Sequence, residues 1–279
     1  MPELPEVEVV ANSLKNKICG CKICEVIVNN RKFRAPVPDD IEQTLCGATI
    51  LSVKRIAKYI IVDLDNQNSI IWHLGMSGKI FVFEKKPETF AKHDHIAIIT
   101  DKCCLVFNDA RRFGLFTTDK TENLKTNRFL KNTGIDPFDD KLDAKYLFEK
   151  LKSKKTAVKL CLLEQDIING IGNIYASEIL FDCGISPLRT ADKVSLAECQ
   201  KIIDSTRKIL QKAIDAGGST LRDYHHIDGS EGHFQGMHCV YGKEGLACPD
   251  CCCDICKTGG IQKIVQGGRS TYFCPKKQK

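Results

Sequence analysis

Pro2, Glu3 and Glu6 stand at the start of a predicted helix and are the first residues that could carry out chemistry. Removal of Met1 would leave a secondary amine at Pro2, which can attack an electrophilic carbon and form an iminium ion. At a helix N-terminus the macrodipole disfavours the ammonium form and so favours the neutral nucleophile. Carboxylates also suit this position, and either glutamate could transfer protons. Ordinary helix initiation explains the same pattern.

Lys58 is the next candidate. It falls in an alternating run from Ile56 to Val62, which predicts a strand that could aim the lysine inward at a phosphate. A surface lysine whose stem packs along apolar groups explains the run equally well. The residues alone leave both interpretations open.

Composition excludes several classes of protein. The chain has 279 residues, of which 43% are hydrophobic and 27% charged, and these fractions are typical of a folded, soluble protein. No 18-residue window is free of charges and strong polar groups, so no membrane span is predicted. The acidic start lacks the apolar core of a secretory signal, and we therefore expect a cytoplasmic protein.

The sixteen cysteines form two groups. In a reducing compartment they should be free thiols, and a cluster of them indicates a metal site. Six lie between Cys248 and Cys274. The other ten are scattered, and we expect them to be small buried hydrophobes: Cys19, Cys21, Cys24, Cys46, Cys103, Cys104, Cys161, Cys183, Cys199 and Cys239.

Positive charge gathers near the cysteine cluster. The formal net charge of the chain is only +6, from 41 basic and 35 acidic residues. Residues 240–279 hold seven basic and three acidic residues, a net charge of +4. Such a segment fits a polyanionic partner, although a merely soluble basic terminus would look the same.

The order of the predicted elements divides the chain into three parts. Residues 3–14 have helical spacing, with Pro2 at the first helical position. Closely spaced β-rich runs then predict an antiparallel sandwich or barrel, and they include residues 56–64, 69–74, 79–83, 95–100 and 104–107. Helices follow over 141–153, 156–165 and 173–183, and a capping box at Ser195–Glu198 opens a longer one that stops at Gly217-Gly218. A long loop over 218–239 precedes a hairpin of 261–266 and 271–274.

We therefore expect an α+β multidomain protein. Its parts are an N-terminal β-sandwich flanked by helices (1–117), a helical domain (118–239) and a C-terminal β-hairpin module of zinc-finger type (240–279).

The first eight residues, MPELPEVE, resemble the start of the formamidopyrimidine-DNA glycosylase family, also called MutM. The likeness recurs in order along nearly the whole chain. The matching motifs are AKY at 57–59, HLGMSG at 73–78, KHDH at 92–95, RRFG at 111–114, GIGNIYASE at 170–178, GGSTLRDY at 217–224 and GGRST at 267–271.

The resemblance implies catalytic roles for matching residues. Pro2 is the nucleophile that attacks the sugar C1′, Glu3 is the acid/base beside it, and Glu6 supports the site. Lys58 is the proton donor associated with strand cleavage by β-elimination. Arg269 contacts a phosphate and is linked to the second, δ-elimination.

The resemblance also implies DNA-contacting residues. Met76, Arg111 and Phe113 match residues that the family inserts into the duplex, where they fill the void left by a flipped base. His93, Lys155 and Asn173 match phosphate contacts, and the motif at 170–173 leads directly into the helix–two-turn–helix element. Ala110 stands where relatives often have proline. Residues 218–235 resemble the lesion-recognition loop.

The zinc module departs from the family pattern. Cys248 and Cys251 match the first ligand pair and Cys274 the third ligand, but Lys277 replaces the expected fourth cysteine. Structural zinc normally takes four ligands, and a protonated lysine is not one of them.

Three arrangements remain open. An unusual insertion, which contains Cys252, Cys253 and Cys256, could supply the fourth ligand. Cys253 and Cys256 could instead replace the first pair, or the module could hold no metal. We expect one structural zinc ion with an open ligand set.

The leading hypothesis is a monomeric bifunctional DNA glycosylase and AP lyase that acts on oxidised purines in damaged double-stranded DNA. Its rivals are an endonuclease VIII-like enzyme for oxidised pyrimidines and a non-catalytic zinc-finger DNA-binding protein. Retention of Pro2, Glu3 and Lys58 together disfavours the second rival.

Overall fold

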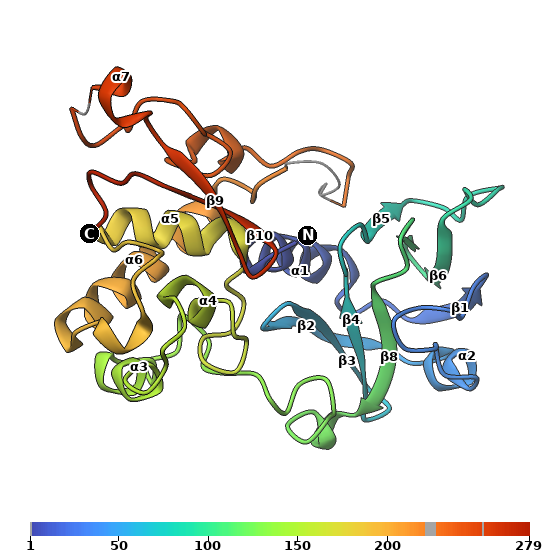
Figure 1. Cartoon of the computed structure of the whole chain (residues 1–279). Coiled ribbons are helices and arrows are strands. Elements are labelled where there is room, and N and C mark those ends of the chain that lie inside the picture. Colours follow the sequence, from blue (N-terminus) through green and yellow to red (C-terminus); the bar gives the residue numbers. More distant parts are fainter. Residues whose placement is uncertain (1, 221–226, 253) are drawn as a thin grey trace. The chain divides into compact units, whose positions relative to one another are not determined.

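The computed structural model describes residues 2–220, 227–252 and 254–279 (Figure 1). The chain forms two compact units. Unit 1 comprises Met1–Lys131 and Ile214–Gln235, and unit 2 comprises Asn132–Ala213 and Gly236–Lys279.

Two four-stranded antiparallel sheets form the core of unit 1. The first has the order β1 (Ile23–Val28), β6 (Asp94–Thr100), β7 (Cys104–Asn108), β5 (Lys79–Phe83). The second has the order β2 (Ile50–Ile56), β3 (Tyr59–Leu64), β4 (Asn68–His73), β8 (Leu115–Lys120). Apolar residues of both sheets share one buried cluster, to which α1 (Leu4–Ile18) and α2 (Ile41–Leu45) contribute. The predicted sandwich flanked by helices is therefore confirmed.

Three aromatic rings pack against one another in the centre of this core. The ring of Trp72 meets Phe107 and Phe116 edge-on, with centroids 5.2 and 5.0 Å apart. These residues come from β4, β7 and β8, so both sheets contribute to the contact. Edge-to-face pairs add to area burial and favour one arrangement of the rings.

Two local predictions in unit 1 are wrong. Helix α1 begins at Leu4 with Glu3 as its N-cap, so Pro2 precedes the cap and Pro5 takes the early helical position. The run from Ile56 is not one strand, because Ala57 and Lys58 form the turn between β2 and β3. Ala57 has φ = +53°, which the sequence conceals because such turns usually carry glycine or asparagine.

Unit 2 contains the predicted helices and hairpin. The helices are α3 (Ala144–Leu151), α4 (Val158–Leu162), α5 (Asn173–Cys183), α6 (Leu196–Asp215, whose last two residues fall in unit 1) and the short α7 (Ile255–Thr258). The hairpin is β9 (Gln262–Gln266) with β10 (Arg269–Phe273). A 3₁₀ turn occupies Ala191–Lys193; another lies in unit 1 at Thr121–Asn123, and a third, Phe234–Met237, spans the boundary between the units in the sequence.

The capping box before α6 is confirmed. The Ser195 backbone N–H donates to Glu198 Oε2 at 2.8 Å, and the Glu198 N–H donates to Ser195 Oγ at 3.3 Å. Helix α7 lies in the cysteine-rich insertion and was not predicted.

The expectation for the scattered cysteines holds only in part. Cys21, Cys104, Cys161 and Cys199 are buried, whereas Cys24 and Cys46 are exposed. In the described part of the chain, no helix is both long enough and apolar enough to span a membrane.

Candidate active site and DNA-contacting groups

Two buried carboxylates follow Pro2, which is itself buried: Glu3 is the N-cap of α1, and Glu6 lies in its first turn. Glu6 Oε2 accepts the backbone N–H of Glu3 at 2.8 Å, and Glu6 Oε1 accepts the backbone N–H of Ser219 at 2.8 Å. Burial of this carboxylate is tolerated because both of its oxygens are hydrogen-bonded. Glu6 thereby joins the start of α1 to the segment that follows α6.

That segment returns on itself where it leaves Gly218. The Phe234 N–H donates to the Gly218 carbonyl at 3.0 Å, and Thr220 Oγ1 accepts the Gly232 N–H at 2.9 Å. A Cβ at Gly232 would lie 2.3 Å from the Gly218 oxygen, so only glycine allows this approach. Hydrogen bonds thus join the two ends of the expected lesion-recognition loop, residues 218–220 and 232–234. Residues 221–226 lie outside the described residues.

The turn that carries Lys58 is linked to α1 by Arg55. Arg55 Nε donates to Glu8 Oε2 at 2.5 Å, and its Nη1 donates to the Ala57 carbonyl at 3.1 Å. The Lys58 residue is only 8% exposed. Arg55 therefore connects the helix that begins after Pro2 to the backbone that presents the proposed proton donor.

His73 lies close to Lys58 and remains neutral. Burial, together with the positive charges of Arg34 and Lys58, lowers the pKa of His73 to about 4. Its Nδ1 accepts the Gly75 N–H at 2.8 Å, which fixes the turn immediately before Met76. The Lys58 turn and the Met76 turn are thus neighbours.

The Met76 turn and the loop 109–114 approach each other closely. A Cβ at Gly75 would lie 2.5 Å from backbone atoms of both Phe113 and Gly114. The Arg111 guanidinium lies 4.8 Å from the centre of the Phe113 ring, whose residue is 49% exposed. The structure therefore groups Met76, Arg111 and Phe113.

A buried aspartate, Asp109, holds this arrangement. Its Oδ1 accepts Ser77 Oγ at 2.6 Å and its Oδ2 accepts the Gly114 N–H at 2.8 Å. The Asp109 N–H donates to the carbonyl of His93 at 3.0 Å, so His93 adjoins the same loop. Sequence reasoning missed Asp109, although its position just before the RRFG motif is a usable signal.

The remaining expected DNA contacts lie in unit 2. Asn173 is the first residue of α5, and its Nδ2 donates to the Ser270 carbonyl of β10 at 2.8 Å. Buried Lys159 Nζ donates to Asn173 Oδ1 and to Thr271 Oγ1, each at 2.7 Å. This network positions β10, at whose start the exposed Arg269 follows a Gly267-Gly268 turn.

Lys155 lies apart from this network. Its Nζ pairs with Asp192 Oδ2 at 2.6 Å, and its side chain is 83% exposed. The Asp192 side chain is only 6% exposed, so the exposed member of this pair is the lysine.

Three of the clustered cysteines form a candidate metal centre. The Sγ atoms of Cys248, Cys251 and Cys274 all lie within 4.8 Å of one another. Cys252 and Cys256 are exposed and do not join this group, and Cys253 lies outside the described residues. Cys274 therefore lies beside Cys248 and Cys251, the pair that matches the family pattern. Cys256, from the alternative pair in the insertion, is not part of the group.

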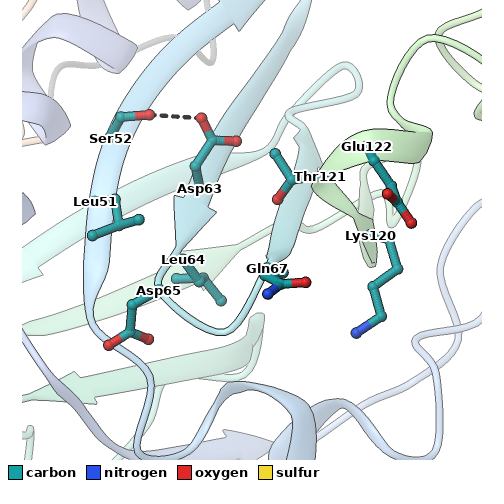
Figure 2. A pocket seen from close by; sticks show the side chains of 9 residues that line it. All are labelled: Leu51, Ser52, Asp63, Leu64, Asp65, Gln67, Lys120, Thr121 and Glu122. Atoms are coloured by element: carbon teal, nitrogen blue, oxygen red, sulfur yellow. Dashed lines mark hydrogen bonds between the residues drawn. The ribbon is translucent and has the colours of Figure 1, made fainter.

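A pocket of about 460 Å³ lies elsewhere on the sandwich (Figure 2). Its lining includes Leu51 and Ser52 at the start of β2 and Asp63 and Leu64 at the end of β3. That is the opposite end of the hairpin from the Lys58 turn. None of the expected site residues lines this pocket.

Comparison with known proteins defines the class. The family model of the formamidopyrimidine-DNA glycosylase N-terminal domain matches residues 1–116, and that of the formamidopyrimidine-DNA glycosylase H2TH domain matches residues 133–225. The chain is thus similar to DNA glycosylases that combine these two domains.

Individual relatives agree over their full lengths. The chain is 44% identical to the formamidopyrimidine-DNA glycosylase of Wolbachia pipientis subsp. Culex pipiens, with 98% of each protein covered. A crystal structure of a Lactococcus lactis Fpg variant with Fapy-dG-containing DNA superposes with a TM-score of 0.91 at 33% identity and full coverage of both chains. The Lactococcus lactis Fpg complex with abasic-site DNA gives 0.90 at 33% identity, with 99% of each chain covered. The chain belongs to the formamidopyrimidine-DNA glycosylase family.

Proposed function

We propose that this protein excises oxidised purines, 8-oxoguanine and formamidopyrimidines, from duplex DNA and then cleaves the strand. The observation that carries the proposal is the start of α1, where Pro2 is followed by buried Glu3 and by Glu6 held through two backbone N–H groups. A fixed acid/base beside an amine suits Schiff-base chemistry at a sugar carbon.

In the proposed mechanism the Pro2 amine attacks C1′ as the C1′–N bond to the base breaks, and Glu3 transfers protons. The C1′–O4′ bond then breaks, O4′ takes up a proton, and the nitrogen lone pair forms an iminium ion at C1′ of the opened sugar. The iminium ion acidifies C2′, and loss of a C2′ proton expels the 3′ phosphate. Lys58 is the proton donor associated with this β-elimination. Arg269 binds a phosphate during the following δ-elimination.

DNA recognition is proposed to use two kinds of group. Met76, Arg111 and Phe113 fill the duplex after the damaged base leaves the stack. Arg111 adds hydrogen-bond donors for base edges. His93, together with unit 2 residues Lys155 and Asn173, contacts phosphates, which position the duplex without reading its sequence.

Borohydride trapping tests the catalytic proposal. The protein with a processed N-terminus should become covalently linked to lesion DNA, and peptide mapping should place the link at Pro2. Pro2→Glu, before which Met1 is retained so that no free amine stands at residue 2, should abolish the adduct, whereas Pro5→Ala, a proline substitution three residues later, should retain it. Absence of an adduct on every lesion tested would leave only a DNA-binding protein.

A panel of lesion duplexes tests the substrate class. Faster excision of 8-oxoguanine than of thymine glycol is expected, since Leu4 and residues 217–235 resemble the purine branch of the family. The reverse order would favour the endonuclease VIII-like alternative.

One zinc ion is proposed at Cys248, Cys251 and Cys274, since three converging thiols suit zinc. It would cross-link the module and take no part in bond breaking.

We further propose that the protein is a monomer, which light scattering tests. We also propose a bacterial cytoplasmic location, where the DNA substrate resides.

A further inference from the structure

Two tight turns meet at the cysteine centre. The first runs from Cys248 to Cys251, and the second runs from Cys274 to Lys277 directly after β10. A four-cysteine metal site would join such turns through two thiolates from each. Here the second turn offers one thiol, and lysine occupies the other position.

The Lys277 side chain instead joins the two turns by charge. Its Nζ pairs with Asp250 Oδ2, and Asp250 belongs to the first turn. The same Nζ lies 3.8 Å from the centre of the Phe181 ring on α5, and the lysine side chain is only 19% exposed. The Asp250 side chain is 49% exposed, so the cation–π contact of Lys277 with Phe181 is what distinguishes this pair from an ordinary surface pair.

Hydrogen bonds between backbone groups and side chains hold the second turn. The Lys277 N–H donates to Cys274 Sγ at 3.5 Å. The side chain of Gln278, a residue 3% exposed, accepts the Cys274 N–H at 2.8 Å and donates to the Ile185 carbonyl at 2.9 Å. The turn is therefore attached to the segment after α5 by contacts that involve no metal.

The opposite side of the module is also attached to α5. Buried Glu178 accepts the backbone N–H groups of Cys239, Val240 and Tyr241 at 2.7, 3.0 and 2.8 Å. The segment at the start of the module, residues 239–241, is therefore held by α5, and the turn after β10 is held by the segment that follows α5.

We propose that the Asp250–Lys277 ion pair replaces the fourth metal–thiolate bond as the cross-link between the two turns. Since no fourth cysteine joins Cys248, Cys251 and Cys274 among the described residues, a metal held there keeps one position for solvent or an external ligand, exchanges readily, and is not needed for the module to fold. The rapid metal exchange rests on the proposed metal site, whereas the ion-pair cross-link does not, and neither rests on the proposed excision activity.

The first test compares the full-length wild type with Lys277→Cys, which restores a fourth thiol. Both proteins are loaded with zinc under reducing conditions and challenged with a strong chelator. Wild type should lose zinc quickly, and its melting temperature should fall by less than about 3 °C. Lys277→Cys should release zinc slowly. Removal of its zinc should lower its melting temperature several-fold more than removal of zinc lowers that of the wild type.

Two further variants locate any hidden ligand. Cys253→Ser and Cys256→Ser should leave the zinc affinity of the wild type unchanged. A large loss of affinity in either would show that the insertion closes the site and would overturn the inference. Equal chelator resistance of wild type and Lys277→Cys would overturn it as well.

The second test is a double-mutant cycle on the metal-free protein with Asp250→Asn and Lys277→Met. Each change should lower the melting temperature by about 2–4 °C, and the double variant should fall no further than either single one. High salt should shrink the effect because it screens the pair. Lys276→Met, the exposed neighbour, is the matched control and should have no effect.

Additive effects in the cycle would overturn the ion-pair cross-link. A wild type that takes up no zinc yet stays folded would refute the proposed zinc site while supporting the cross-link. Borohydride trapping on the same preparations reports the catalytic proposal separately.

Discussion

Arg55 controls the geometry of the Lys58 turn through two hydrogen bonds, one to Glu8 of α1 and one to the Ala57 carbonyl. We expect Arg55→Met to slow strand cleavage about ten-fold, since small displacements of a reacting group reduce rates strongly. Borohydride trapping at Pro2 should be much less affected. Arg55→Lys should recover part of the rate, because lysine retains the charge but lacks the fork that reaches both partners.

Single-turnover kinetics that separate base loss from strand cleavage measure this effect. Lys54→Met is the control, since Lys54 lies on the same strand and pairs with Asp63 instead. Equal slowing of both steps by Arg55→Met would indicate general disruption rather than positioning of Lys58.

His73 predicts a loss of stability in mild acid. Its pKa is about 4 in the folded chain against 6.5 for the free group, so the unfolded chain takes up the proton first as pH falls. This contribution to the free energy of unfolding is complete above pH 6.5 and is lost towards pH 4. Between pH 7.5 and 5 it amounts to about 2 kcal/mol.

Urea unfolding at the two pH values tests this prediction. His73→Asn should lose less stability between them than the wild type does, whereas exposed His233→Asn should behave like the wild type. Buried His238, whose pKa is also lowered to about 4 by burial and by Lys243, supplies a second acid-sensitive contribution in unit 2. An unchanged pH dependence in His73→Asn would contradict the assignment.

At the scale of elements, the loop between β7 and β8 depends on Asp109. We expect Asp109→Asn to lower the free energy of unfolding by about 2 kcal/mol, because an amide cannot accept both Ser77 Oγ and the Gly114 N–H in the same way. Affinity for a lesion duplex should also fall, since the backbone that carries Arg111 and Phe113 loses its anchor.

Denaturant unfolding and duplex titration measure these two effects. Asp119→Asn provides the control, because Asp119 lies on β8 and accepts a hydrogen bond from Asn127 rather than from the loop. Its affinity for the lesion duplex should stay close to that of the wild type. A matching loss of affinity in both variants would refute a specific role of Asp109.

At the scale of the whole molecule, DNA affinity should depend on salt according to the number of phosphate contacts. Arg269→Gln should make the slope of log K against log salt about 0.9 shallower, because one contact is lost. Phe113→Ala should weaken binding with no change in slope, since an inserted ring releases no counterions. Titrations between 50 and 200 mM salt distinguish these outcomes.

Much of the architecture could be predicted from short-range patterns. Strand alternation indicated the sandwich, and the Ser195–Glu198 capping box located the start of α6. The β2–β3 turn could not be predicted, because Ala57 reaches positive φ only where β-pairing on both sides imposes it. The domain boundaries at 117 and 239 and the individual site roles stay predictions.

The sequence by itself determined the candidate chemistry, since Pro2, the two glutamates after it and the motifs at 73–78 and 111–114 are local patterns. The tertiary structure alone decided which distant groups meet. It brought Ser219 to Glu6, Asp109 to Ser77 and Lys277 to Asp250. The physical reason is that such partners lie far apart along the chain, and only the packed backbone brings their atoms within hydrogen-bonding distance.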